Sequence, residues 1–550
     1  MSQVFHPWDW VIVVATMVAS IGIGLYYRFT GGRQKTNEEY LMADRNMSIF
    51  PVAVSLMASF MSSITLLGVS SENFYYGSIF VVINIAYGLA TPIITQLYLP
   101  VFYGLQKTSG YEYLELRFGP KIRMIASLTY TLQMVLYNGI VLYAPAIVIE
   151  AVTGLDRLVS ILSVGLVCTF YTTLGGMKAA LITDLLQSLL MLLSVFIVLI
   201  HGSMKVGGLG NVFRIAMDGG RMDFLKFSLD PTVRHTWWSL IIGGMCTYIS
   251  LYGVNQTQVQ KLLTLSTLNR SRMALWVSWP VLSVLSITTC LCGLAMYAVY
   301  HDCDPFSAGE INSLDQLLPY YVVNALNDSP GLLGLFVAGI FSGSLSTISS
   351  ACNSLAAVTV TDYVGRWCKV RENVEPWLTK LLACGYGLLI LGITFLAELL
   401  GGVLQAALTI FGAVGGPLWG VFTLGMFTTY ATETGSSVGL LSALAFTLWI
   451  SFGGPRPSIE KLPLSVEGCP GNLTNPEPVE INPTDYMYLY RISYMYIGLI
   501  GFLWVILVGS LVSLCTKKPE KPLDPALFTP FLANRIRRLK TEMESSHVKE

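Results

Sequence analysis

Between Phe341 and Ser354 the chain reads F-S-G-S-L-S-T-I-S-S-A-C-N-S, inside an apolar segment that begins near Leu332 and reaches about Val360. A helix that faces lipid gains nothing from so many hydroxyls, whereas a helix inside a bundle can hydrogen-bond its neighbours with them. Hydroxyl and carbonyl oxygens can also replace the water shell of a small hard cation. Taken alone, the stretch predicts an inward-facing helix and favours packing over ion binding. Its hydroxyls belong to Ser342, Ser344, Ser346, Thr347, Ser349, Ser350 and Ser354.

The composition indicates a protein that crosses a membrane many times. Of its 550 residues, 53% are hydrophobic and 12% are charged, about half the charged share of soluble proteins. The formal net charge is zero, so nothing indicates a nucleic-acid partner. No phosphate-binding loop, zinc-protease motif or serine-hydrolase motif is found, and the five histidines are scattered. We therefore expect neither an enzyme nor a cofactor, and the lipid bilayer is the expected surroundings.

Apolar segments predict an all-α polytopic membrane protein with about 13 transmembrane helices. The first of them is expected to be a true span, because Arg28 rather than a small-residue cleavage site follows it. The expected spans are residues 9–27, 49–71, 78–103, 122–149, 157–175, 181–202, 236–256, 273–299, 332–362, 378–399, 403–427, 435–453 and 492–515.

Lysine and arginine are unevenly divided between the two sets of loops, which predicts the orientation. The cytoplasmic side of a membrane protein carries the excess of basic residues. The richer set includes Lys261, after the seventh span, and the tail 516–550. We therefore expect the N-terminus outside and the C-terminus in the cytoplasm, at the plasma membrane. The poorer, outer loops hold Arg157, Lys205, Arg214, Arg221, Lys226, Arg234, Arg456, Lys461 and Arg491.

The longest outer loops, 203–235, 300–331 and 454–491, carry two further features. Asn472 begins the sequon Asn-Leu-Thr, and its place in an outer loop predicts glycosylation. Cys303 and Cys469 are the cysteines of these loops. Oxidising conditions outside the cell permit a disulfide between them, which we favour over two free thiols.

Two spans look interrupted by small residues. In the second span, Gly68 and the run Ser70–Glu72 weaken the helix, which either unwinds there or ends near Gly68. In the seventh span, Gly243, Gly244 and Gly253 are possible interruptions. Broken helices five spans apart point to two inverted repeats of five helices, with the binding site between them.

This reading divides the chain into four parts. Residues 1–48 would hold the first helix and an inner loop, and 49–427 the transport core. Residues 428–515 would hold the last two helices with the glycosylated loop, and 516–550 a cytoplasmic tail.

Within the core, Asp184 near the start of the sixth span is either an interface group or, inside the bundle, a functional one. Tyr87, Tyr137 and Tyr248 either line a cavity or pack.

Seven motifs, in matching order, carry a family resemblance. They read A-S-F-M-S at 58–62, G-Y-E-Y-L-E-L-R-F at 110–118, Y-N-G-I-V-L-Y-A-P-A at 137–146, F-Y-T-T-L-G-G-M-K-A at 170–179, Y-G-V-N-Q-T-Q-V-Q at 252–260, D-C-D-P at 302–305 and S-G-S-L-S-T at 342–347. Together they resemble the sodium/solute symporter family, in the branch of the iodide, multivitamin and monocarboxylate transporters. The resemblance covers roughly residues 9–515, and it implies a LeuT-type 5+5 inverted-repeat core and sodium-driven uptake by alternating access.

The resemblance also implies site residues. Sodium would be bound by the carbonyls of Ala58, Met61 and Gly343 and by the hydroxyls of Ser346 and Thr347, with Ser62 near a second ion. Asp184 resembles a carboxylate linked to ion coupling. Positions similar to the substrate cavity of the family are Thr65, Tyr87, Tyr137, Tyr248, Leu404 and Leu408.

Two departures bear on the substrate. Thr65 stands where the iodide transporters have glutamine, and Tyr248 stands where they have tryptophan. We therefore expect sodium as co-substrate and a small organic anion, either a monocarboxylate or a vitamin carboxylate, as cargo. The alternatives are iodide or another small anion, or a channel or non-transporting sensor on the same scaffold.

Overall fold

The described residues are mostly helical and form no strand. The computed structural model describes residues 5–30, 37–174, 176–326, 329–367, 371, 374–397, 402–457, 459–470, 485–516 and 524–547. The long continuous helices are α1 (Pro7–Phe29), α8 (Pro120–Thr153), α9 (Arg157–Leu174), α10 (Met177–Lys205), α14 (Leu268–Tyr300), α16 (Leu332–Val358), α18 (Glu375–Ala397), α21 (Glu433–Phe452) and α23 (Ile497–Cys515).

Other spans contain π-helical turns or breaks. Helices α5 (Ile83–Ile93) and α6 (Leu99–Leu105) continue each other through such a turn, as do α19 (Val403–Ile410) and α20 (Gly416–Phe427). Helix α12 (Gly244–Ile249) has a π-helical turn on each side. The second span is α3 (Ile49–Phe60) followed by Thr65–Tyr76, which ends in α4 (Ser70–Tyr76), and its halves are bent by 64°.

All thirteen predicted spans fall on helical segments. Within the part of the chain that is described, ten helices are long and apolar enough to cross a membrane, or eleven with the bent pair. Two shorter apolar helices, Arg157–Tyr171 and Ser239–Val254, stand where the fifth and seventh spans are expected. The protein is therefore a multi-pass membrane protein, and the count of thirteen crossings stays a prediction.

The break in the second span lies at Met61–Ile64, earlier than we predicted. Met61 leaves the helical conformation with φ −78° and ψ 96°. The predicted breakers Ser70 and Ser71 are instead helical, because their hydroxyls donate to the carbonyls of Leu66 and Leu67, one turn back, at 2.6 and 3.0 Å. Serine hydroxyls bonded in this way are compatible with a helix, although they often bend it.

The seventh span breaks at Asn255, two residues after Gly253. Asn255 is extended, with φ −70° and ψ 131°, and its side chain accepts a hydrogen bond from the Thr257 backbone N–H at 3.0 Å. This N-cap starts the short helix α13 (Gln256–Leu262). Both interrupted spans therefore are broken, although neither breaks at a glycine.

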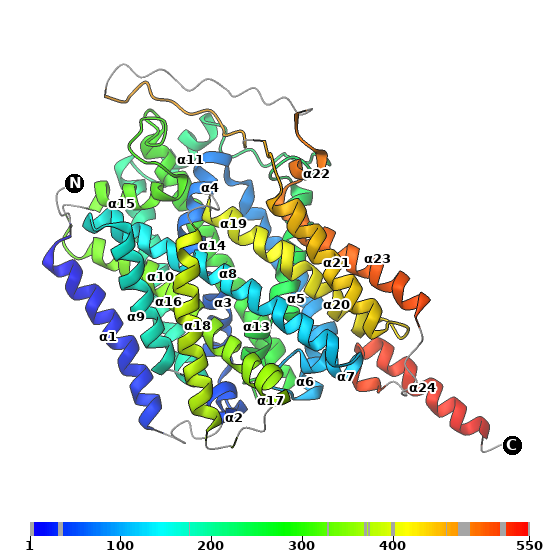
Figure 1. Ribbon diagram of the computed structural model, residues 1–550. Helices are drawn as coiled ribbons and strands as arrows, with labels where there is room; N and C mark the ends of the chain where they lie inside the picture. The colour runs from blue at the N-terminus through cyan, green and yellow to red at the C-terminus, as the bar shows by residue number, and fades with distance from the viewer. Residues whose placement is uncertain are drawn as a thin grey trace.

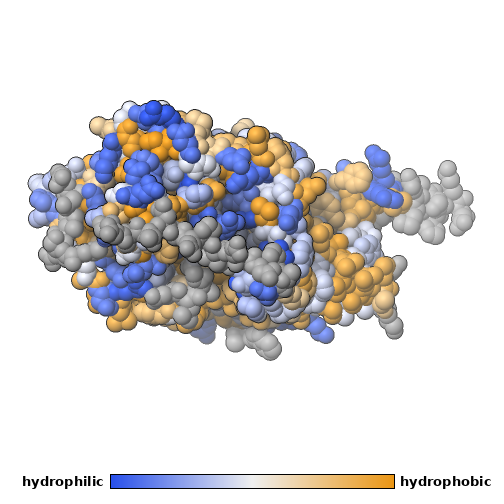
Figure 2. All heavy atoms as spheres, turned by 90° about the horizontal axis from the view of Figure 1, so that it is seen from above, coloured by the Kyte–Doolittle hydropathy of each residue, from blue (hydrophilic) through white to orange (hydrophobic). Residues whose placement is uncertain are grey.

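The helices run between two ends of the molecule (Figure 1). One end carries α11 (Leu209–Asp218), α15 (Leu317–Leu326) and α22 (Tyr488–Arg491). The other carries α2 (Asn37–Met42), α7 (Glu112–Arg117), α17 (Gly365–Trp367) and α24 (Pro530–His547). Helix α1 begins at the first end and α24 lies at the second, as an odd number of crossings requires. Hydrophilic residues cover much of the first end (Figure 2).

Helix α16 stands at the centre of the bundle. Its most apolar window is 89% buried, against 17% for the peripheral α1. It packs against α8, α10 and α18, and α10 and α14 in turn pack against α3. The predicted inward-facing helix is therefore confirmed, since every hydroxyl of the stretch Phe341–Ser354 is buried.

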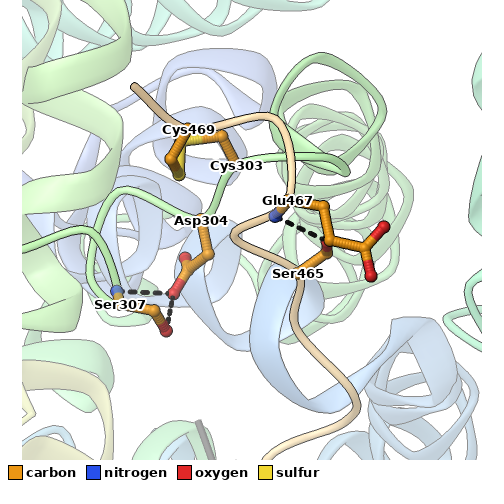
Figure 3. The surroundings of a disulfide bond; sticks show 6 residues. All are labelled: Cys303, Asp304, Ser307, Ser465, Glu467 and Cys469. Atoms are coloured by element: carbon orange, nitrogen blue, oxygen red, sulfur yellow. Dashed lines mark hydrogen bonds between the residues drawn. A yellow bond between two sulfur atoms is a disulfide. The ribbon is translucent and has the colours of Figure 1, made fainter. Parts of the chain in front are cut away.

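A disulfide joins two segments at the first end of the molecule (Figure 3). Cys303, just after α14, is bonded to Cys469, and their Cα atoms are 4.9 Å apart. Beside the bond, Asp304 accepts hydrogen bonds from the Ser307 backbone N–H and hydroxyl at 2.8 and 2.6 Å. The predicted glycosylation site, Asn472, lies outside the described residues.

Close packing of α20 on α23 gives a test of this architecture. A Cβ atom on Gly416 would lie 2.3 Å from the Gly498 carbonyl oxygen, a backbone atom that cannot move unless the helices separate. We expect Gly416→Ala to lower the free energy of unfolding by about 1–3 kcal/mol, measured as a lower melting temperature in detergent.

The matched control is Gly392→Ala in α18, where no atom lies within 4 Å of the added carbon. Alanine favours a helix over glycine by about 1 kcal/mol, so this variant should match or exceed the wild-type melting temperature. Equal melting temperatures for the two variants would contradict the packing described here.

Candidate functional site

The centre of the site is a close contact between α16 and the break of the second span. A Cβ atom on Gly343 would lie 2.8 Å from the Ser63 backbone nitrogen and 3.2 Å from the Ser62 carbonyl carbon. Only glycine lets the two backbones approach in this way. The helical turn around Gly343 is thereby placed directly beside the residues where the helix is interrupted.

Oxygen atoms gather at this contact. The Thr347 hydroxyl lies 2.9 Å from the Gly343 carbonyl oxygen and 3.4 Å from the Ala58 carbonyl oxygen. The Met57 carbonyl of α3 still accepts a hydrogen bond from the Met61 N–H at 2.8 Å. Because α3 ends at Phe60, the carbonyls of its last turn after Met57 lack the partners that a continuing helix would supply. Met61 directly follows that turn. Carbonyl and hydroxyl oxygens of this kind are the ligands that a small hard cation prefers.

Ser346, the neighbour of Thr347, faces a different group. Its hydroxyl donates to Asp184 Oδ1 of α10 at 2.6 Å. Asp184 is 1% exposed and also accepts a hydrogen bond from the Ser55 hydroxyl. The interpretation of Asp184 as a group at the membrane interface is therefore wrong, because the carboxylate lies inside the bundle.

Lys261, which we assigned to an inner loop, is instead fully buried. Its ammonium lies 3.0 Å from Asp184 Oδ2, donates to the Ser55 hydroxyl at 2.7 Å and also contacts the Ser59 hydroxyl. The assignment was wrong because α13, which follows the break at Asn255, is buried along its whole length. The residue that neutralises Asp184 was therefore missed, although a carboxylate inside a membrane requires such a partner.

The other hydroxyls of α16 serve mainly to join helices. Ser344 lies 2.6 Å from the Ser63 hydroxyl and donates to the Val141 carbonyl at 3.0 Å. Ser354 lies 2.6 Å from the Tyr130 hydroxyl and 2.8 Å from that of Thr257. These bonds agree with the packing interpretation for both serines.

A small cavity of about 40 Å³ lies next to the oxygen cluster. Five of the six residues expected at the substrate cavity line it, together with Met61 and Ser62 from the break. No lysine, arginine or histidine is among its lining residues. The expected residues at its wall are Thr65, Tyr87, Tyr137, Leu404 and Leu408.

Tyr248, the sixth expected residue, stands behind the wall. Its ring stacks on that of Tyr87 with centroids 4.9 Å apart, and on that of Tyr252 at 4.3 Å. Its fully buried ring therefore supports the wall instead of forming it. On the opposite side, the Tyr137 hydroxyl lies 3.4 Å from that of Ser62.

A second buried ion pair lies toward the end that carries the disulfide, and sequence reasoning missed it. Arg234 donates to the two carboxylate oxygens of Glu72 at 2.6 and 2.9 Å and to the Gln405 side-chain oxygen at 2.9 Å. Its guanidinium also lies over the rings of Tyr76 and Tyr494. We call the Glu72–Arg234 pair the latch. The signal for it was a carboxylate within an apolar span, as for Asp184.

His235 contacts the latch without adding charge to it. Its Nε2 lies 3.5 Å from Glu72 Oε1 and 2.8 Å from the Tyr494 hydroxyl. Burial lowers the pKa of His235 to about 4, and the nearby Glu72 carboxylate only partly opposes this. The ring is therefore neutral at physiological pH, and Arg234 alone balances Glu72.

The buried pair Lys261–Asp184 leads to a stability prediction. Lys261→Met leaves the Asp184 carboxylate buried without a countercharge, which typically costs about 3–5 kcal/mol. We expect a large drop in melting temperature in detergent. Adding Asp184→Asn should restore most of the loss, because no uncompensated charge then remains. A double variant as unstable as the single one would refute this view of the pair.

The chain is similar to a known protein family and to several known transporters. The sodium:solute symporter family matches residues 40–442. A putative sodium-dependent multivitamin transporter of Drosophila melanogaster is 52% identical over 88% of this chain and 83% of its own length. The human sodium-coupled monocarboxylate transporter 1 is 43% identical over 84% and 77%, and the rabbit (Oryctolagus cuniculus) sodium-dependent multivitamin transporter is 44% identical over 82% and 71%.

Among solved structures, a Na⁺-coupled sialic acid symporter in a substrate-bound outward-open state is similar, with a TM-score of 0.78. It is 22% identical and covers 94% of this chain and 100% of its own. This likeness confirms the predicted LeuT-type helical fold. The family match and the identities together show that the chain belongs to the sodium:solute symporter family.

Proposed function

We propose that the protein imports a small organic anion, a monocarboxylate or a vitamin carboxylate, together with sodium. The observation that carries this proposal is that Met61 and Ser62 belong both to the break beside the oxygen cluster and to the cavity wall. An ion bound by the Ala58, Met61 and Gly343 carbonyls and the Thr347 hydroxyl would hold the break in one conformation. That conformation sets the shape of the adjoining cavity, so ion and substrate would stabilise each other's sites.

The charge of the cavity supports the same coupling. Its lining offers hydroxyls, from Ser62, Thr65, Tyr87, Tyr137 and Ser286, but no basic side chain. A carboxylate buried there needs positive charge nearby. In our proposal bound sodium supplies that charge, with Ser62 near a second ion. Inward movement of one positive charge gains about 2.3 kcal/mol per 100 mV of membrane potential.

Ser346 and Asp184 form a second layer in this scheme. The Ser346 hydroxyl already donates a hydrogen bond to Asp184. An ion that enters beside Thr347 would also attract the Ser346 oxygen as a ligand. Ion binding would thereby change the hydrogen bond to the Asp184 carboxylate. Asp184 would then couple ion binding to α10. The Lys261 ammonium, 3.0 Å from Asp184 Oδ2, provides a countercharge for that carboxylate when no ion is bound.

The substrate class follows from the cavity wall and the relatives. Aromatic and aliphatic side chains with a few hydroxyls suit an organic body that carries a polar group. The multivitamin and monocarboxylate names of the relatives agree with that choice. Iodide is the alternative cargo, and a channel or a sensor is the alternative activity.

The remaining proposals concern the cell. We place the protein in the plasma membrane with the N-terminus outside and the tail 516–550 in the cytoplasm, which puts the disulfide and Asn472 outside. Asn472 would be glycosylated there. We retain the division into residues 1–48, 49–427, 428–515 and 516–550.

Uptake in sodium and in choline buffer tests the proposed function. Cells expressing the full chain are given labelled pyruvate, lactate, biotin, pantothenate or iodide. We expect sodium-dependent uptake of at least one of the four carboxylates and little of iodide. Equal uptake in both buffers would indicate a channel, and no uptake of any compound would favour a sensor. Iodide as the preferred cargo would overturn the substrate class.

Thr347→Ala tests the ion site. Loss of the hydroxyl removes one oxygen ligand, and a bond to a charged group contributes about 1.5–3 kcal/mol. We expect the apparent sodium constant to rise about tenfold or more, with surface expression intact. Thr347→Ser, which keeps the hydroxyl, should stay close to wild type.

Ser342→Ala is the matched control, because Ser342 lies on the same helix and makes no hydrogen bond within the described residues. It should leave the sodium constant unchanged. Unchanged sodium dependence in Thr347→Ala would reject the assignment of Thr347.

A further inference from the structure

A second and larger cavity lies at the end that carries the disulfide. Its volume is about 690 Å³, within the usual range for small-molecule sites. Its lining comes from three stretches of chain, within 226–235, 456–463 and 490–494, with Tyr76 and Gln405. We call it the vestibule. It shares no lining residue with the central cavity.

The latch lies between the two cavities. Arg234 and Gln405 line the vestibule, while Leu404, the neighbour of Gln405, lines the central cavity. Likewise His235 lines the vestibule, and its ring lies 5.4 Å from that of Phe80, which lines the central cavity. Side chains that line the vestibule therefore contact or directly adjoin residues that line the central cavity.

The vestibule is strongly basic. One acidic residue, Glu460, is found among its lining residues. Five of the nine basic residues that we assigned to outer loops line the vestibule. Basic residues are scarce in the outer loops of membrane proteins. Those five are Lys226, Arg234, Arg456, Lys461 and Arg491.

Three of these cations are not balanced by a carboxylate. Arg234 is neutralised by Glu72, but Lys226, Arg456 and Lys461 form no ion pair with any carboxylate of the described ranges. Within the described residues, Arg456 donates to two backbone carbonyls, those of Gly453 and Ile450.

Lys461 rests against aromatic rings. Its ammonium lies 3.8 Å from the centroid of Phe306 and 5.2 Å from that of Tyr75. Burial lowers the pKa of Lys461, while the Asp304 carboxylate acts in the opposite direction. A partly buried cation with no carboxylate partner is what an incoming anion can pair with.

We propose that the vestibule is a second anion-binding site, which captures the carboxylate of the organic anion before it passes the latch. The outward orientation and the cargo rest on the proposed function. A concave surface of one sign of charge raises the local concentration of the opposite ion and its arrival rate by about 10–10³-fold. The vestibule thus supplies the positive charge that the central cavity lacks.

A charged thiol reagent measures the potential of the vestibule directly. Ile459→Cys places a thiol in the vestibule wall, and Leu209→Cys places one on α11, at the same end but outside the vestibule. The two native side chains are similarly exposed, at 37% and 41%. Each full-length variant reacts with an anionic and a cationic methanethiosulfonate of similar size, and the ratio of the two rates is recorded.

We expect the anionic-to-cationic rate ratio at position 459 to exceed that at 209 by about tenfold or more. Raising the salt concentration should reduce the excess. Lys226→Gln, Arg456→Gln and Lys461→Gln together should remove it, and Lys461→Gln alone should reduce it if the triple variant fails to fold. Equal ratios at the two positions would overturn the proposal.

Protection by pyruvate tests binding itself. Pyruvate should slow the anionic modification of Ile459→Cys, whereas its uncharged methyl ester should not. Equal effects of acid and ester, or none, would show that the vestibule does not bind carboxylates. Neither the rate ratio nor the protection by pyruvate requires sodium or transport. A failure of the sodium-uptake test would therefore contradict the proposed function, while the modification rates would still test anion binding in the vestibule.

The uptake assay links the site to transport. At low ionic strength, the triple variant should raise the KM for pyruvate about tenfold while the maximal rate stays near wild type. Lys205→Gln with Arg214→Gln removes outer charge away from the vestibule and should leave KM unchanged. Equal KM changes in both variants would show a general surface effect and contradict capture by the vestibule.

Discussion

The approach of α16 to the broken second span, at Gly343, is the contact on which the rest of the site depends. It places the C-terminal end of α3 and the break after it against the continuous helix α16. The Ala58 carbonyl, near that end, therefore accepts a hydrogen bond from the Thr347 hydroxyl of α16. Polar backbone groups inside a bilayer are costly unless they are satisfied. A bound cation satisfies them as well as a hydroxyl does. In the proposed function, the interruption of the second span would thereby provide part of the sodium site.

The seventh span is tied at both ends by a buried ion pair. Arg234 precedes it and pairs with Glu72 of the second span, and Lys261 follows its break and pairs with Asp184 of α10. The central cavity between these pairs measures about 40 Å³. At this volume the cavity has no room for an organic anion unless the surrounding side chains or helices move.

Helix placement could be predicted from sequence because a bilayer permits few alternatives: each apolar run of sufficient length became a helix, and the hydroxyl-rich run took the centre. Five of the six positions expected at the substrate cavity do line one cavity, while their role in binding substrate stays a proposal. The position of the breaks was not predictable. Ser70 and Ser71 satisfied their own hydroxyls within the helix, while the break fell at Met61, whose side chain gives no sign of it.

Lys261 was missed for a related reason. A basic residue just after a span is normally solvated, whereas here the whole of α13, which follows the break at Asn255, is buried.

The disulfide also bears on how the molecule is assembled. Cys303 follows α14, and its partner comes 166 residues later in the chain. Before the two thiols can meet, α16, α18, α19 with α20, and α21 must be synthesised and inserted so that Cys469 reaches the same side. A chain that stops or misinserts within those helices keeps a free thiol at Cys303. Formation of the bond therefore requires that the helices between Cys303 and Cys469 have been inserted into the membrane in the correct order.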